Sequence, residues 1–138
     1  MILHCVFFTF RSDAPQDARR AVLTGLAELC ADLDGALAFE SGPNLDFEGK
    51  SQDYRDGFVI RFADRPAVKA YAEHPTHRRL GGQLCDLCQN GADGIIVFDL
   101  DVPGAQLKRP TKKAAPWGTA LEIPQRRWFR NPGLRTSS

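Results

Sequence analysis

The first ten residues, MILHCVFFTF, predict a β-strand that is apolar on both of its faces. Alternate side chains of a strand point to opposite faces of the sheet. One face would carry Ile2, His4, Val6, Phe8 and Phe10, and the other Leu3, Cys5, Phe7 and Thr9. A strand buried on both faces needs a cover on each side. Helices can cover one face in a chain of 138 residues, and we expect a second copy of the same sheet to cover the other.

The segments that follow alternate between helical and strand patterns. Ser12 and Pro15 predict the start of a helix that carries an apolar stripe and stops at Asp34-Gly35, with Gly35 in the left-handed conformation. Strands are predicted over 36–45, 54–62 and 94–102. A second helix is expected from Asp64 until Pro75 ends it, and a third from a Thr76 cap to Asn90-Gly91.

This order of elements predicts an α+β, ferredoxin-like split βαβ fold, with an antiparallel four-stranded sheet and helices on one face. The apolar face that the helices leave open predicts a homodimer in which two sheets pack face to face. We therefore expect a pocket in each subunit between sheet and helices, where a small hydrophobic molecule could bind.

Charge divides the chain near residue 102. Residues 1–102 hold 10 Lys and Arg against 16 Asp and Glu, whereas residues 103–138 hold 8 against 1. We expect one domain over 1–102 and a basic extension over 103–138 that contains five prolines, Trp117 and Trp128. The aromatic residues and opposite charge favour an arm docked on its own domain or on the partner subunit. A free tail and a nucleic-acid-binding segment at 126–130 are the alternatives, and the acidic domain disfavours nucleic acid because it repels phosphate.

The sequence points to a cytoplasmic protein that needs no cofactor. No apolar run approaches the ~20 residues that span a membrane, and the N-terminus lacks a basic region and a cleavage site. Cys85 and Cys88 form a Cys-x-x-Cys pair late in a helical pattern, without the second pair that a zinc site requires. Buried thiols are the favoured interpretation, and a metal or redox pair is the alternative. No phosphate-binding, dinucleotide-binding or zinc-protease motif occurs.

One cluster of polar residues, Tyr71-x-x-His74-Pro75-x-His77, lies among apolar residues. His4 is the single histidine of the first strand. Tyr71 and His74 share a helix face, and the break at Pro75 allows His77 to turn towards the sheet. If His4 faces the helices, two imidazoles and a phenol would meet in an apolar pocket suited to proton transfer. The alternative is that these residues have a structural role. The ring nitrogens of His4 would then be hydrogen-bonded in the core, and Tyr71 would anchor its helix.

Four features occur in order along residues 2–102: His4 in the first strand, the segment FESGPN at 39–44, the strand GFVIRF at 57–62, and the Tyr71–His77 motif. Together with Val97-Phe98-Asp99 they resemble the stress-responsive α/β-barrel (Dabb) domain. That resemblance implies a dimeric α/β barrel made from two ferredoxin-like sheets. Most members of the family have no assigned reaction.

A plant branch that is similar over these motifs performs polyketide cyclisation. By that resemblance His77 would be the general base, held by His4, and Tyr71 would polarise an oxygen atom. We also expect His74, Phe8 and Phe58 to bind the ligand, and no metal to take part. If the protein is an enzyme, it would be a cofactor-independent lyase of the cyclase type, or an enzyme like the monooxygenases that share this barrel. The alternative is a non-catalytic stress-response or ligand-binding protein.

Overall fold

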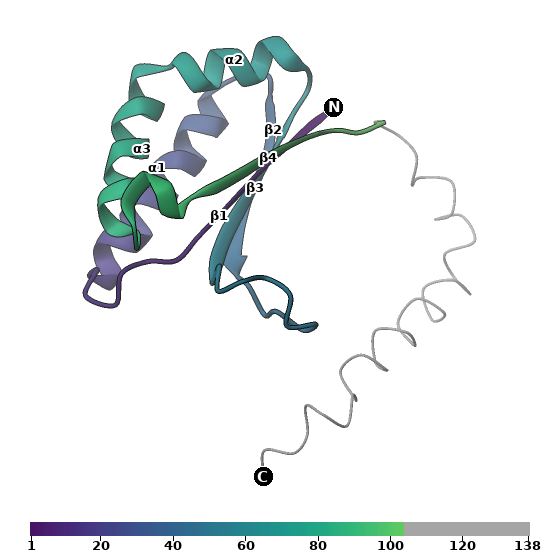
Figure 1. Cartoon of the computed structure of the whole chain (residues 1–138). Helices are drawn as coiled ribbons and strands as arrows, with labels where there is room; N and C mark the ends of the chain where they lie inside the picture. Colours follow the sequence, from purple (N-terminus) through teal and green to yellow (C-terminus); the bar gives the residue numbers. More distant parts are fainter. Residues whose placement is uncertain (104–138) are drawn as a thin grey trace, which may run out of the picture. The chain divides into compact units, whose positions relative to one another are not determined.

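A computed structural model describes residues 1–103, which form one sheet with helices on one of its faces (Figure 1). The strands are β1 (Ile2–Phe8), β2 (Ala36–Pro43), β3 (Asp56–Phe62) and β4 (Ile96–Asp101). The helices are α1 (Gln16–Asp32), α2 (Arg65–Glu73) and α3 (Pro75–Leu87), and a 3₁₀ turn, η1 (Gly91–Gly94), precedes β4. The sheet is antiparallel in the order β2-β3-β1-β4, so the ferredoxin-like fold predicted from the order of elements is confirmed.

The register of β1 decides which side chains meet the helices. Alternate residues of β1 face the helices, and three of their β3 partners, Phe58, Ile60 and Phe62, are buried. The helix-facing residues of these two central strands are Ile2, His4, Val6, Phe8, Phe58, Ile60 and Phe62. They pack against the stripe of α1, whose buried members are Val22, Leu26, Leu29 and Cys30. The two alternating sets predicted for the first strand therefore correspond to the two faces of the sheet.

The ends of α1 differ from the prediction. The helix begins at Gln16 behind Pro15, and no side chain caps it, so Ser12 is not its cap. It ends at Asp32 with an extended Leu33, and Gly35 is not left-handed. The chain needs a glycine at position 35 for another reason, because a Cβ there would overlap the Cβ of Ala67. Close approach of α2 to the start of β2, rather than a helix stop, therefore explains Gly35.

His74 joins α2 to α3. It is the last cap of α2, with its backbone N–H donating to the Tyr71 carbonyl, and the first cap of α3, with its Nδ1 accepting from the Thr76 N–H at 3.0 Å. The prediction that Thr76 caps this helix is therefore wrong. Pro75 occupies the first helical position, where a missing N–H is harmless. The bend expected at Pro75 is present and brings the first turn of α3 back against Tyr71.

The opposite face of the sheet has no cover within residues 1–103. In β4 the side chains of Phe98 and Leu100 are each about half exposed, at 49% and 50%. They stand opposite Cys5 and Leu3 of β1, so the exposed surface is continuous across the two strands. We call this the outer face. Because this face is apolar, it is the face that still needs the second cover predicted from the first strand.

The four cysteines are all free. Cys30 and Cys88 are buried, and burial raises the pKa of each thiol to about 11, which makes both poor nucleophiles. Among residues 1–103 no helix has the length and apolar character needed to cross a membrane. The docked arm predicted for 103–138 lies outside the described residues apart from Pro103.

Candidate functional site

Tyr71 lies between the two histidines that the sequence motif singled out. Its side chain comes from α2 and is 1% exposed. Its ring centroid lies 5.7 Å from that of His4 on β1 and 4.3 Å from that of His77 on α3. Phe62 closes the group from β3, 5.2 Å from Tyr71. The structure therefore brings together His4, Tyr71 and His77, which we call the histidine–tyrosine cluster.

A carboxylate on β4 holds His4. The Nδ1 of His4 lies 2.7 Å from Oδ1 of Asp99, its direct partner in the β1–β4 register. Because the ionised carboxylate can only accept, Nδ1 carries the proton and Nε2 is left with a free lone pair. The His4 side chain is 14% exposed and that of Asp99 48%, so the bond sits at the margin of the core.

The main chain, and not His4, holds His77. Its Nδ1 donates to the Ala72 carbonyl at 3.1 Å, which again leaves the Nε2 lone pair free. Burial lowers the pKa of His77 below 6.5, the hydrogen bond to Ala72 opposes this shift, and the positive charge of Arg78 adds to it. His77 is therefore a neutral base at pH 7. The expectation that His4 holds His77 stays a prediction; the hydrogen bond of the His77 ring goes to Ala72, and that of the His4 ring goes to Asp99.

Tyr71 remains a neutral phenol. Burial, and next the nearby Cys30, raise the pKa of its hydroxyl well above the ordinary value of 10. Every fully buried polar side-chain atom of residues 1–103 has a hydrogen-bond partner, and Tyr71 Oη makes no bond to these residues. The hydroxyl therefore keeps some access to solvent although its ring is buried. A neutral imidazole can remove a proton from a bound molecule. The neutral phenol beside it can donate a hydrogen bond to an oxygen atom of the same molecule.

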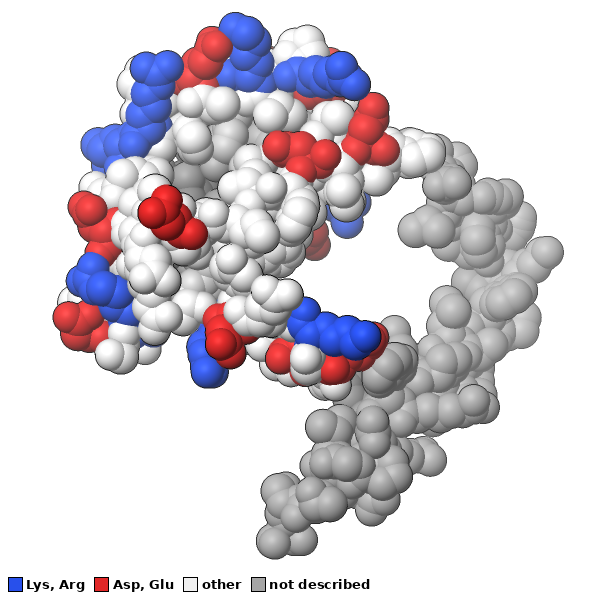
Figure 2. All heavy atoms as spheres, in the orientation of Figure 1, with Lys and Arg blue, Asp and Glu red and all other residues white. Residues whose placement is uncertain are grey.

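A small hollow lies beside α2 and next to Asp99, the partner of His4. It measures about 320 Å³, and its lining residues are Ile2, Arg65, Val68, Lys69, Asp99 and Asp101. Asp99 connects it to His4, but the three clustered rings do not line it. In Figure 2 Lys and Arg side chains gather at the top of the molecule, over α2 and its junction with α3, with acidic side chains among them. Arg65 lies 3.8 Å from Asp101, and Lys69 lies 2.7 Å from Glu73.

Of the three residues expected to bind ligand, Phe8 and Phe58 lie apart from the cluster and His74 lies next to it. Phe8 and Phe58 are buried in an aromatic group with Phe10 and Phe39, in which the ring of Phe58 stacks 5.2 Å from that of Phe39. His74 is only partly buried, and its Nδ1 is engaged in capping α3. The ligand-binding roles assigned to these residues remain predictions.

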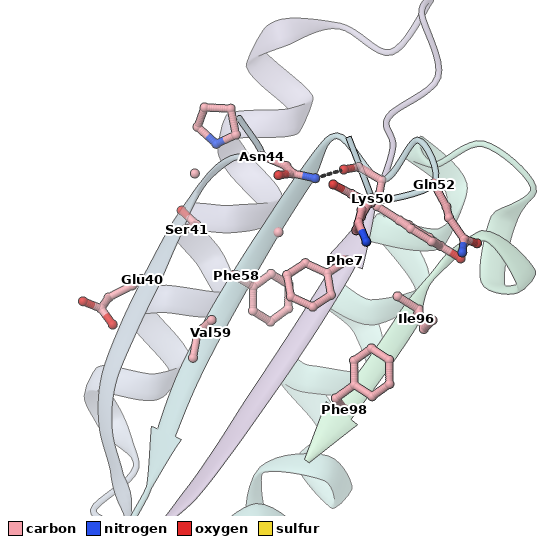
Figure 3. A pocket seen from close by; sticks show the side chains of 15 residues that line it. Phe7, Glu40, Ser41, Asn44, Lys50, Gln52, Phe58, Val59, Ile96 and Phe98 are labelled. Carbon is pink, nitrogen blue, oxygen red and sulfur yellow. Dashed lines mark hydrogen bonds between the residues drawn. The ribbon is translucent and has the colours of Figure 1, made fainter. Parts of the chain in front are cut away.

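The larger hollow lies on the other side of the sheet from the cluster. It measures about 640 Å³ and opens on the outer face, beneath the loop that joins β2 to β3. Figure 3 shows Phe7, Ile96 and Phe98 along the strands, with Asn44, Lys50 and Gln52 at the loop. We call it the outer-face hollow. The pocket expected between sheet and helices is therefore not the largest one in the described part of the chain.

Asp99 holds a member of the cluster, His4, and no functional role was predicted for it from the sequence. An acidic residue among the apolar residues of 95–100 was the available signal, and its pairing with His4 depends on a register between segments 95 residues apart. Within residues 1–103 no three His, Cys, Asp or Glu side chains gather in a way that would hold a metal ion.

The fold and the first-strand histidine define a class of small ferredoxin-like α+β proteins. The sequence matches the stress-responsive A/B barrel domain (Dabb) over residues 2–102, and the chain belongs to this family. No curated protein matches the sequence.

Solved structures agree with this assignment. A dimeric ferredoxin-like protein of unknown function from Jannaschia sp. CCS1 is 44% identical, with a TM-score of 0.69 over 73% of this chain and 98% of that one. A Dabb family protein from Mesorhizobium loti is 22% identical, with a TM-score of 0.59 over 75% and 97%. The hydroxynitrile lyase of Passiflora edulis is 13% identical, with a TM-score of 0.65 over 76% and 95%, and shares the fold alone.

Proposed function

We propose that this Dabb protein is a homodimer that binds a small hydrophobic molecule and transfers a proton on it without a cofactor. The observation that carries this function is the contact of His77 with Tyr71, in which a neutral imidazole and a neutral phenol lie 4.3 Å apart between ring centroids. The free Nε2 of His77 would take a proton from an acidic C–H or O–H group. The electron pair left behind would move towards a carbonyl oxygen that Tyr71 stabilises by a hydrogen bond.

His4 and Asp99 support this chemistry from the sheet. The carboxylate keeps the proton of His4 on Nδ1 and orients the ring edge-on to Tyr71, at an angle of 69°. With Nδ1 engaged by Asp99, Nε2 of His4 would serve as a second acceptor for the bound molecule. The hollow beside Asp99 offers the approach, since it lies between α2 and the edge strand β4. The hydroxynitrile lyase from Passiflora edulis supports testing a cyanohydrin as substrate, as an analogy of fold only.

The exposed outer face supports the dimer. Its apolar side chains on β4 and β1 form a surface of the kind that two copies bury against each other. The Jannaschia relative, a dimeric protein by its description, belongs to the same fold and is 44% identical. Leu100→Lys should produce monomers in analytical ultracentrifugation because it places a charge in the middle of this face. Lys69→Glu on α2 should leave the dimer intact.

The activity is testable without a known substrate. Wild-type protein should accelerate exchange of deuterium into the acidic C–H position of aryl and alkyl β-diketones, as followed by NMR, and should cleave an aryl cyanohydrin. His77→Gln should lower these rates by about a hundredfold or more. The matched control is Arg79→Gln, which changes an exposed residue further along α3 and leaves the base and its charged neighbours in place.

A second function is favoured by one specific observation. The rings of the histidine–tyrosine cluster line neither hollow, which is the arrangement expected of a non-catalytic stress-response protein with a structural cluster. In that case no member of the diketone and cyanohydrin panel would react faster than in buffer. His77→Gln and His4→Gln would then change only the free energy of unfolding.

A further inference from the structure

We propose that the outer-face hollow is a second ligand site, which takes a flat aromatic molecule carrying one anionic group, with Lys50 as the partner of that group. The site is separate from the histidine–tyrosine cluster, which lies on the helix side of the sheet. The proposed homodimer matters to this site only because the second subunit would cover the open side of the hollow.

The strands provide an apolar floor, on which the rings of Phe7 and Phe98 are tilted by 53° to each other. Phe7 of β1 and Phe98 of β4 lie side by side on the outer face, with ring centroids 6.5 Å apart. Gly57 of β3 stands opposite Phe7, and a Cβ there would lie 2.6 Å from Cδ1 of Phe7 and 2.9 Å from the Val6 carbonyl oxygen. The bare backbone therefore lets the Phe7 ring lie against the neighbouring strand. A planar aromatic molecule could stack on this floor.

The loop between β2 and β3 provides a preformed wall. The carboxylate of Asp46 accepts hydrogen bonds from the backbone N–H groups of Lys50 and Ser51, at 3.0 and 3.2 Å, and from the Ser51 hydroxyl. These bonds lower the pKa of Asp46, the Ser51 bond contributing most. Asn44 donates from Nδ2 to the Tyr54 carbonyl at 2.6 Å and ties the two ends of the loop together. A wall fixed in advance reduces the ordering that binding requires.

The charge of the hollow favours an anion. Its lining contains two charged side chains, Glu40 and Lys50. Glu40 lies 3.6 Å from Arg61 on β3, so a cation already faces it. No carboxylate of residues 1–103 lies within 4.0 Å of the Lys50 ammonium group. Figure 3 shows Lys50 above the sheet near Phe7, where its ammonium group could meet the anionic end of a molecule stacked on the floor.

The size of the hollow suits a small molecule. A volume of about 640 Å³ lies within the ~300–1,000 Å³ that is common for such sites. The alternative occupant is the second copy itself, if its side chains fill the hollow when the two outer faces meet. If the second copy fills the hollow, no space for a small molecule remains in the dimer. If the second copy only covers it, the hollow stays open to a ligand.

Two fluorescent probes that differ by one charge test this site on the full-length dimer. Anilinonaphthalene sulfonate carries a planar aromatic system and one anionic group, and N-phenylnaphthylamine has the same rings without the charge. Both should bind once per subunit. Lys50→Gln should weaken the sulfonate by about fivefold and leave the neutral probe unchanged. Lys69→Gln, which removes an exposed lysine on the helix side, is the matched control and should change neither affinity.

Amide NMR locates the probes. The sulfonate should shift the backbone signals of Gly57 and Ser51 and leave those of Tyr71 and His77 unchanged. Equal sulfonate affinity in wild type and Lys50→Gln, shifts confined to Tyr71 and His77, or a dimer that binds neither probe would each overturn the site. His77→Gln should leave probe binding intact, so loss of proton transfer and loss of this site are independent results.

Discussion

His4 and Asp99 stand directly opposite each other on β1 and β4, and one hydrogen bond of 2.7 Å fixes the proton of the imidazole on Nδ1. Asp99 on the edge strand β4 thus determines which ring nitrogen of His4, on the central strand β1, carries no proton. The carboxylate that does so lines the hollow beside α2, so a molecule entering there would meet Asp99 before it reached Tyr71.

Asp99→Asn should change the tautomer of His4. An amide can donate as well as accept, so the Nδ1 proton of His4 is no longer required, and the ¹⁵N shifts of its imidazole should move towards a mixture of tautomers. The free energy of unfolding should fall by less than about 1 kcal/mol, since the Asp99 side chain is 48% exposed. Asp101→Asn, two residues along the same strand face, should leave the His4 shifts as they are. Identical imidazole spectra in Asp99→Asn and wild type would contradict the role given to Asp99.

Tyr71→Phe and Tyr71→Ala should separate the hydroxyl from the ring. The ring is buried against Phe62 and His77, so the alanine variant should lose about 3–5 kcal/mol of unfolding free energy. The hydroxyl bonds to no described residue, so the phenylalanine variant should stay within about 1 kcal/mol of wild type. Urea denaturation measures both. A large loss in Tyr71→Phe would show that the hydroxyl has a structural partner.

His77 should make stability fall at acidic pH. Its pKa is lowered in the folded state, so the unfolded chain binds the proton more readily once the pH drops below 6.5. The stabilisation of wild type relative to His77→Gln is thus complete above that pH and shrinks as the pH falls through the folded-state value. Urea unfolding at about pH 7 and about pH 5 measures this difference. Arg79→Gln serves as the control, and a wild-type advantage over His77→Gln that is independent of pH would contradict burial of a neutral imidazole.

Gly35 and Gly42 should respond in opposite ways to alanine. A Cβ on Gly35 would overlap Ala67, so Gly35→Ala should lose about 1–3 kcal/mol of unfolding free energy as α2 moves away from β2. Nothing lies within 4 Å of a Cβ on Gly42 in β2, and its alanine variant should be neutral or slightly more stable. Thermal unfolding of the two variants is a direct comparison. Equal melting temperatures would show that α2 can shift without loss.

The fold was predictable because its signals are local. Alternation in the first strand, the stripe of α1 and the proline at the α2–α3 bend each depend on residues close in sequence. The caps were less predictable. Ser12 and Thr76 have capping side chains, yet Pro15 starts α1 and the imidazole of His74 caps α3. Competition between neighbouring candidates at a helix end is decided by the path of the chain into it.

The site was predictable only in part. The spacing of Tyr71 and His77 around Pro75 was enough to bring their rings together. The strand period placed His4 with Ile2 and Val6 but left open whether this set faces the helices. Asp99 required the β1–β4 register, which couples residues 95 positions apart. The outer-face hollow required the folded shape of the loop after β2, where Asp46, Gln52 and Asp53 adopt positive φ without being glycine. Such a shape arises from several hydrogen bonds acting together, and no sequence pattern specified it.

The single-residue junction at His74 has a consequence for how this family can vary. Because α2 ends and α3 begins on the same residue, no slack separates the two helices. Each residue inserted there would turn His77 by about 100° around the axis of α3 and carry its ring away from Tyr71. The length of the chain between the two side chains is therefore as much a determinant of the cluster as their chemical identities, and a sequence that keeps both residues but changes the spacing should lack it.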